Sequence, residues 1–183
     1  MTLDPREELV EHIPAMRAFA MSLTRNSALA DDMVQDALVK AWTKIESFEA
    51  GTNMRAWLFT ILRNTYYSHF RKARREVEDG DGVLSANLAQ KPDHDGRLQM
   101  RDFNTAFAQL NAEQKEALVL VGAGGFSYEE AAETCGVKVG TIKSRVNRAR
   151  ARLAELMGLD EDDRLEATDI VTSGIVAENP SAA

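Results

Sequence analysis

Apolar side chains in the first third of the chain recur at intervals of three and four residues, the spacing that places them on one face of an α-helix. Three amphipathic helices are predicted: one over Pro5–Thr24, where Pro14 can introduce a kink, one from an N-cap at Ser27 to about Gly51, and one that starts after Asn53 or the threonine before it. Their predicted buried faces consist of Leu9, Ile13, Met16, Ala20 and Leu23; of Val34, Leu38, Ala41, Trp42 and Ile45; and of Trp57, Leu58, Ile61, Leu62 and Thr65. A three-helix domain is therefore expected here.

A second group of helical patterns begins near residue 98. One helix is expected to bury Leu98, Phe103, Phe107 and Leu110. Asn111 is a predicted N-cap for a short helix, Ser127 and Glu130 have the spacing of a capping box, and Gly136 stands where a helix can end in the left-handed conformation. The last helix is predicted over Val139–Met157. A short helix, a tight turn and a longer basic helix in this order have helix-turn-helix spacing.

The segment between the two groups is acidic, carries turn formers at both ends and has little periodicity, which predicts a flexible linker. We therefore expect an all-α protein with two small helical domains. The predicted bounds are 1–76 for the three-helix domain, 77–97 for the linker, 98–158 for the helix-turn-helix domain and 159–183 for an acidic tail. A chain of 183 residues with 44% hydrophobic residues can form two such domains.

Charge is segregated along the chain. Asn53–Arg75 and Lys138–Arg152 contain no aspartate or glutamate and six lysines or arginines each, although the protein has a net charge of −7. The remaining residues therefore sum to −19. Two concentrated basic segments in an acidic protein predict two surfaces that bind polyanions.

The last helix divides into an inner and an outer face on a helical wheel. Ile142, Val146, Ala149 and Leu153 are predicted to pack into the domain, which leaves Lys143, Ser144, Asn147, Arg148 and Ala151 outside. Lysine and asparagine can reach base edges in the major groove, and the four arginines of this segment, at 145, 148, 150 and 152, suit phosphates. The alternative is a solvated basic face, but such faces normally mix charges of both signs.

The third predicted helix has a different chemistry. Cations and rings share one face of it, formed by Arg63, Tyr67, Arg71 and Arg74 with Asn64 and Tyr66 beside them. Interleaved aromatic and basic side chains suit single-stranded nucleic acid, in which bases stack on rings and cations follow the backbone. Core packing is an equal alternative for Tyr66 and Phe70, and Trp42 and Trp57 are predicted core residues.

Other classes of protein find little support. The single cysteine, Cys135, cannot form an internal disulfide and is predicted to be a core residue rather than a redox sensor. His12, His69 and His94 are far apart, so no metal or other cofactor is predicted, and the chain has no nucleophile–base pair or phosphate loop that would indicate an enzyme. Without a membrane span or signal peptide, a cytoplasmic protein with no membrane partner is expected.

The order of these elements resembles the extracytoplasmic-function (ECF, group 4) sigma factors of bacterial RNA polymerase over residues 8–157. Ala30–Asp36 with the following Ala41-Trp42 is similar to sigma regions 2.1 to 2.2, and Arg55–Asn64 is similar to regions 2.3 to 2.4. Ser127–Ala132 and Gly140–Arg150 resemble region 4.2. The strings closest to the EcfG general-stress-response class are His12–Ala20, Ser22–Asn26 and Gly51–Trp57.

The resemblance implies a function for each domain. Region 2 is expected to bind the β′ clamp helices of core RNA polymerase through Asp32, Gln35 and Asp36. It is also expected to open and recognise the −10 promoter element, through Phe48, Asn53, Arg63, Asn64, Tyr67 and Arg71. Region 4 is expected to bind the β flap of the polymerase and to read the −35 element of promoter DNA, through Lys143, Ser144, Arg145, Asn147 and Arg148.

Two other functions are compatible with parts of the pattern. A helix-turn-helix regulator that acts without polymerase would use residues 138–152 and leave residues 28–75 without a role. A sigma-like decoy would only sequester an anti-sigma protein, but such decoys carry a receiver domain, for which this chain has no room. For the EcfG class, the resemblance implies an anti-sigma factor of the NepR type that wedges between the two domains, countered by a phosphorylated sigma-mimicking response regulator.

Overall fold

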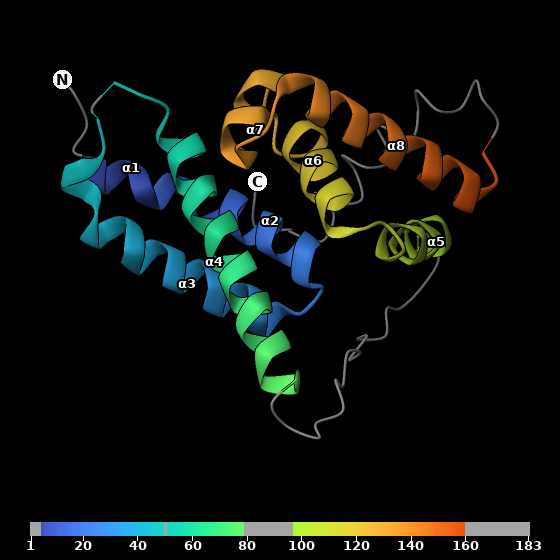
Figure 1. Cartoon of the computed structure of the whole chain (residues 1–183), viewed down its shortest axis with the longest axis horizontal. Helices are drawn as coiled ribbons and strands as arrows, with labels where there is room; N and C mark the ends of the chain where they lie inside the picture. Colours follow the sequence, from blue (N-terminus) through green and yellow to red (C-terminus); the bar gives the residue numbers. More distant parts are fainter. Residues whose placement is uncertain (1–4, 50, 79–96, 160–183) are drawn as a thin grey trace. The chain divides into compact units, whose positions relative to one another are not determined.

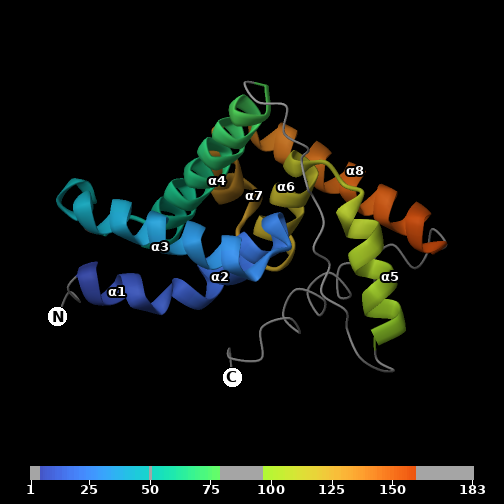
Figure 2. The same cartoon turned by 90° about the horizontal axis from the view of Figure 1, so that it is seen from below.

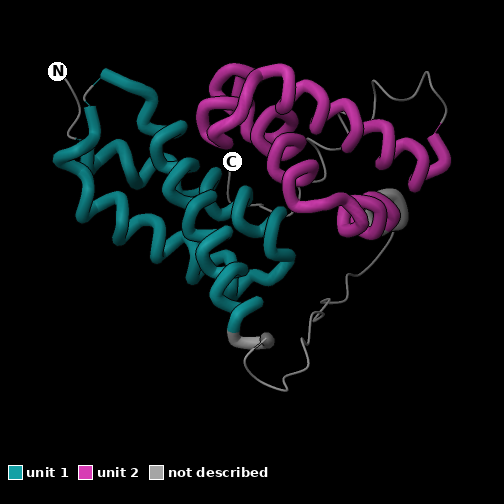
Figure 3. The backbone as a smooth tube through the Cα atoms, viewed as in Figure 1, with its two compact units in different colours: residues 1–90 teal, residues 91–183 magenta. Residues whose placement is uncertain are grey.

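The computed structural model describes residues 5–49, 51–78 and 97–159, which contain helices and no strand. They belong to two compact units, one within residues 1–90 and one within 91–183 (Figure 3). The first unit contains α1 (Pro5–Glu11), α2 (Ile13–Thr24), α3 (Ser27–Thr43), the 3-10 helix η1 (Ile45–Ser47) and α4 (Met54–Glu78) (Figure 1). The second contains α5 (Arg97–Ala108), α6 (Ala112–Gly122), α7 (Tyr128–Cys135) and α8 (Val139–Met157). The predicted all-α class is confirmed.

The predicted domain bounds remain predictions, because most of the expected linker (77–97) and almost all of the expected tail (159–183) lie outside the described residues. At both ends of the linker the structure is more helical than expected. α4 continues to Glu78, two residues past the predicted end of the first domain, and α5 begins at Arg97.

The first predicted helix is divided in two. α1 ends at Glu11 and α2 begins at Ile13, so the expected single helix over Pro5–Thr24 was wrong. Pro14 is the physical reason, because it has no N–H to donate to the carbonyl four residues earlier and is accommodated only in a first helical turn. It occupies the first turn of α2. The described part of the first unit thus contains four α-helices rather than three.

α3 differs from its prediction at both ends. Its N-cap is Asn26, whose side chain accepts a hydrogen bond from the Leu29 amide at 3.0 Å, and not Ser27. The α-helix ends at Thr43 instead of continuing to about Gly51. Its buried face is formed by Ala30, Met33, Val34, Ala37 and Ala41. Trp42 is 56% exposed, so its assignment to the core was wrong: one residue after Ala41 turns it about 100° away from that face.

The core of the first unit lies between α2, α3 and α4, and α4 runs obliquely across the other two (Figures 1 and 2). Phe19 of α2 packs against Phe59 of α4 with ring centres 5.2 Å apart, and both side chains are buried. A buried phenylalanine contributes about 1.5–3 kcal/mol relative to an exposed one. Met16, Met33, Leu58 and Leu62 complete the centre. This packing holds α4 in place against α2 and α3.

The second unit follows the prediction closely. Asn111 forms a capping box with Gln114, Ser127 forms one with Glu130, and Gly136 ends α7 at φ 66°, in the left-handed region. α8 packs on α5, α6 and α7. The two reciprocal caps and the glycine fix where α6 and α7 begin and where the turn into α8 lies.

Candidate nucleic-acid interface

The outer face of α8 is available to a ligand as the helical wheel predicts. Lys143, Asn147 and Arg148 are exposed and Ser144 is half-buried. On the inner face, Ile142, Val146, Ala149 and Leu153 are all at most 1% exposed. α7 and the turn at Gly136 precede α8 in helix-turn-helix order, and an α-helix with these polar side chains fits a major groove.

Arg145 lies apart from this outer set. Its Nη2 atom is 2.9 Å from Glu113 Oε2 on α6, and only 16% of its side chain is exposed. Arg145 and Glu113 contribute to the wall of a cleft of about 380 Å³ between the start of α6 and the first half of α8, lined by Asn111, Glu113, Gln114, Gly140, Thr141, Ser144, Arg145 and Arg148. The guanidinium thus bridges two helices within the unit.

Ion pairing reduces the basic charge of α8 that a ligand can meet. Besides Arg145, Arg152 is paired with Glu155 at 2.7 Å. Lys138, Lys143 and Arg148 are exposed and form no ion pair with any residue that the structure describes. The Lys143 ammonium lies 5.7 Å from the centre of the ring of Tyr128, the first residue of α7. This cation–π contact favours a position of the Lys143 side chain beside the start of α7.

Cations and rings alternate on α4 as predicted. The Arg63 guanidinium lies 4.7 Å from the centre of the Tyr67 ring, and Arg71 Nη2 donates to Ser68 Oγ at 3.4 Å. Tyr66 is buried, with its ring 4.5 Å from that of Phe70, whereas Phe70 is 45% exposed. Core packing was one of two alternatives for these rings. It holds for Tyr66, whereas Phe70 lies at the surface beside the basic residues.

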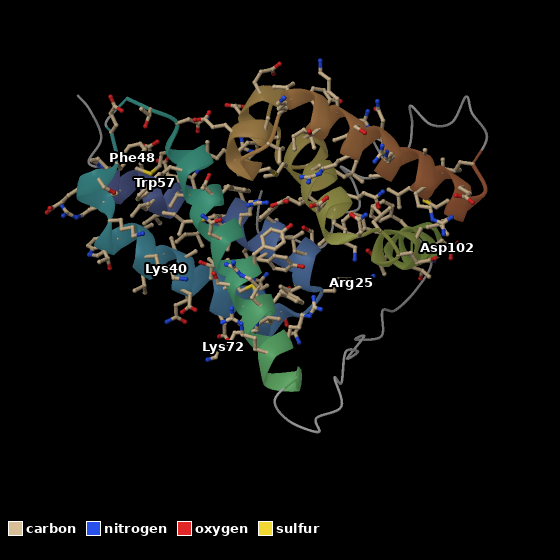
Figure 4. All side chains as sticks on the ribbon, in the orientation of Figure 1. Arg25, Lys40, Phe48, Trp57, Lys72 and Asp102 are labelled. Atoms are coloured by element: carbon tan, nitrogen blue, oxygen red, sulfur yellow. The ribbon has the colours of Figure 1, made fainter. Side chains whose placement is uncertain are left out.

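Two other residues predicted to act at the −10 element, Phe48 and Asn53, lie in the connection between α3 and α4. Phe48 packs on Trp57 with ring centres 5.2 Å apart, and Figure 4 shows the two together at the end of the unit where α4 begins. Asn53 is the N-cap of α4, because its Oδ1 accepts from the Ala56 amide at 3.0 Å. Trp57 is half-buried, so its packing partly supports the core assignment. Phe48 and Asn53 therefore also shape the loop and the start of α4.

The exposed face of α3 carries the three residues expected to bind polymerase. Asp32, Gln35 and Asp36 are all exposed. Val39 and Trp42 continue the same face along the helix and are 61% and 56% exposed, which is unusual for large apolar side chains. Val39 and Trp42 were not predicted to belong to this face, although they follow Gln35 and Asp36 at steps of three and four residues.

Asp31, which neighbours this face, is engaged within the unit. Arg17 on α2 donates from Nε to Asp31 Oδ1 at 2.6 Å and from Nη2 to Oδ2 at 3.3 Å. These hydrogen bonds are the main reason that the pKa of the Asp31 carboxyl lies below its ordinary value and that of Arg17 above it. Asp31 therefore links α2 to α3, whereas Asp32 and Asp36 point to solvent.

Both units match family models of bacterial transcription factors. Residues 9–76 match the model "Sigma-70 region 2" and residues 100–153 match "Sigma-70, region 4". In the described residues, no helix combines the length and apolarity needed to span a bilayer. The fold is that of a sigma factor, and the chain belongs to the sigma-70 family.

Relatives place the chain among the ECF sigma factors of RNA polymerase. It is 48% identical over 170 residues to "ECF RNA polymerase sigma factor EcfG" of Rhodopseudomonas palustris, covering 93% of this chain and 94% of the relative. It is 37% identical over 135 residues to "ECF RNA polymerase sigma factor SigC" of Mycobacterium tuberculosis, covering 73% and 72%. Among solved structures, it is similar to the sigma factor RpoE in complex with the anti-sigma factor NepR from Bartonella quintana, at 54% identity and a TM-score of 0.77, covering 85% of this chain and 97% of that one. The predicted resemblance to ECF sigma factors of the EcfG class is confirmed.

Proposed function

We propose that this protein binds core RNA polymerase as an alternative sigma factor and directs it to promoters with −10 and −35 elements, for the general stress response. The observation that carries the proposal is the presence, in one chain, of two helical surfaces built on acid-free segments with different chemistry: the outer face of α8 within residues 138–152 and the ring-bearing face of α4 within residues 53–75. A polymerase-independent regulator needs only the first. A decoy that binds no DNA needs neither.

For the −35 element, the proposed base-reading residues are Lys143, Ser144 and Asn147, with Arg148 at the phosphates. Exposed lysine and asparagine side chains can pair with guanine and adenine edges in the major groove. We assign Arg145 a positioning role instead of the DNA contact predicted from sequence, because its guanidinium is mostly buried and paired with Glu113. It would hold α8 against α6 while its neighbours bind DNA.

For the −10 element, the proposed surface combines Asn64, Tyr67 and Arg71 of α4 with Arg63 and the 48–53 loop. Cations next to a half-buried ring such as that of Tyr67 can hold an unpaired strand, because stacking contributes about 1–3 kcal/mol per base. Flipping a base out of the duplex costs a few kcal/mol, so one or two such contacts offset it. Phe48 and Asn53 would act by shaping the loop.

Two protein partners are proposed. The α3 face with Asp32, Gln35 and Asp36 would bind the β′ clamp helices, joined by the exposed Val39 and Trp42, and the second unit would bind the β flap. An anti-sigma factor of the NepR type is the proposed inhibitor, supported by the similarity to a sigma factor solved in complex with NepR. We expect this chain to co-purify with an anti-sigma factor of the NepR type. An excess of core polymerase should abolish that co-purification.

The test of the function compares free protein with holoenzyme. We expect the holoenzyme to bind a promoter duplex far more tightly than the free chain at the same salt concentration, because the net charge of −7 opposes DNA binding and polymerase aligns the two units. Lys143→Ala and Asn147→Ala should weaken binding through the −35 element only. Equal affinity of free protein and holoenzyme would contradict the proposal and favour a polymerase-independent regulator.

A further inference from the structure

A basic cleft lies between the end of α3 and the middle of α4, outside every residue set predicted from sequence to bind a ligand except at Asn64. It has a volume of about 130 Å³ and is lined by Lys40, Lys44, Ile61, Asn64, Thr65 and Ser68. Since about 10–15 Å³ of such space holds one water molecule, the cleft can take a larger group. None of its lining residues is acidic.

One of its two lysines is held in place. Lys40 Nζ donates to Thr65 Oγ1 at 3.0 Å, and the same hydroxyl donates to the Ile61 carbonyl at 2.9 Å. Thr65 is only 5% exposed, so a polar atom in the wall of the unit fixes the ammonium (Figure 4 labels Lys40 on α3). An ammonium has three N–H donors, and Lys40 uses one of them here.

Among the residues that the structure describes, no carboxylate pairs with either lysine of the cleft. Lys40 and Lys44 form no ion pair within the described part of the chain, although Asp36 stands one turn before Lys40 on α3. The dipole of α3 favours cations at its C-terminal end, which accounts for lysines there. It does not account for a lysine directed onto α4 next to the amide of Asn64 and the hydroxyl of Ser68.

The cleft continues the proposed −10 surface. Asn64, Ser68 and Arg71 follow at steps of four and three on one face of α4, and Arg71 Nη2 donates to Ser68 Oγ. Lys40 and Lys44 of α3 therefore add two cations beside a track of neutral and basic groups. A cleft lined by ammonium, amide and hydroxyl donors, with no acid in its lining, can bind the anionic oxygens of a phosphodiester.

We propose that Lys40, Lys44, Asn64 and Ser68 form a seat for one backbone phosphate of the unpaired promoter strand. This inference rests on the proposed function. Lys40 and Lys44 bind the phosphate oxygens as cations, while Asn64 and Ser68 donate neutral hydrogen bonds. The seat reads no base and fixes the path of the strand along α4.

The experiment uses holoenzyme reconstituted from core polymerase and the full-length chain. The probe is single-stranded DNA carrying the non-template −10 sequence of a promoter from which this holoenzyme initiates, without a −35 element. Its affinity is measured between about 0.1 and 0.4 M salt for the wild type and for Lys40→Gln, Lys44→Gln and the double variant. Lys115→Gln, on α6 of the second unit, is the matched control, because it removes the same charge from a unit that this probe does not engage.

One lost phosphate contact lowers the slope of log affinity against log salt by about 0.7, which at 0.1 M salt corresponds to roughly a fivefold loss. We expect this change for the double variant, smaller changes for the single variants and none for Lys115→Gln. Lys40→Arg should retain the slope. If the double variant binds core polymerase normally and binds the single-stranded probe with the affinity and salt slope of the wild type, the proposed phosphate seat is wrong.

Two further outcomes are distinguishable. If the double variant binds the probe normally within holoenzyme but needs more core polymerase to assemble, the lysines face the polymerase and the seat is wrong. If wild-type holoenzyme fails to initiate at any duplex promoter, the proposed function itself fails, and this control is made before any variant is measured. Thermal unfolding of each variant excludes misfolding as the cause of a loss.

Discussion

The ion pair between Glu113 and Arg145 gives a prediction that separates a positioning role from a DNA contact. The Arg145 side chain is 16% exposed and that of Glu113 is 61% exposed, and Arg145 Nη2 lies 2.9 Å from Glu113 Oε2. Exposed pairs contribute about 0.2–1 kcal/mol, and breaking a fully buried pair costs about 3–5 kcal/mol. Because only the arginine is withdrawn from solvent, we expect Glu113→Gln to cost about 1 kcal/mol, near the exposed limit. In a unit of this size that lowers Tm by about 4–8 °C.

The assay must report on the second unit, and both tryptophans lie in the first, so tryptophan fluorescence is unsuitable. Amide hydrogen exchange of peptides from α6 and α8 in the full-length chain measures the local loss of stability that Glu113→Gln and Arg145→Ala cause. In holoenzyme on a −35 duplex, Arg145→Ala should leave the salt slope unchanged, whereas Arg148→Ala should reduce it by about 0.9. A slope reduced by about 0.9 in Arg145→Ala with unchanged exchange would refute the positioning role.

Three further predictions concern other contacts. Ser127→Ala removes a capping box and should destabilise the second unit by about 1 kcal/mol, seen as faster exchange in α7, whereas Ser127→Thr should retain most of the protection. Trp42→Ala should change the free energy of unfolding by about 1 kcal/mol or less, because this side chain is 56% exposed and the Arg6 guanidinium lies over its ring, yet it should weaken core polymerase binding at least tenfold. Normal binding would contradict its place in the interface. Asp31→Asn should reduce stability near neutral pH but not in acid: the folded-state pKa of Asp31 is below its ordinary 3.8, so its contribution is present above that value and is lost as pH falls through the folded pKa. Thermal unfolding at both pH values measures this difference, and a deficit that persists in acid would contradict it.

The second unit could be predicted almost completely from its sequence because its signals are local. Caps at Asn111 and Ser127, the left-handed Gly136 and the periodicity of α8 each depend on residues within one or two turns. Cys135 is buried, as predicted for a core residue. Local rules agree with the tertiary packing here, so the outer face of α8 was identified correctly.

The first unit was predicted less well because the decisive contacts are between helices. Ala41 and Trp42 are adjacent apolar residues near the end of α3, and periodicity alone did not indicate which of them packs on the neighbouring helices. The same limit applies to one contact of the second unit: the pairing of Arg145 with Glu113 joins residues 32 positions apart and has no local signature. The cleft of Lys40 and Lys44 likewise depends on how α3 crosses α4, so no local sequence pattern indicates it.

The central claim is that this chain converts core polymerase into a promoter-specific enzyme through both surfaces. Run-off transcription with core polymerase and a library of duplex promoters tests it most directly. The account predicts defined transcripts that depend on the chain, that are reduced by Lys143→Ala with Asn147→Ala, and that are reduced separately by Arg71→Ala. Transcripts no more abundant than those from core polymerase alone would contradict the claim.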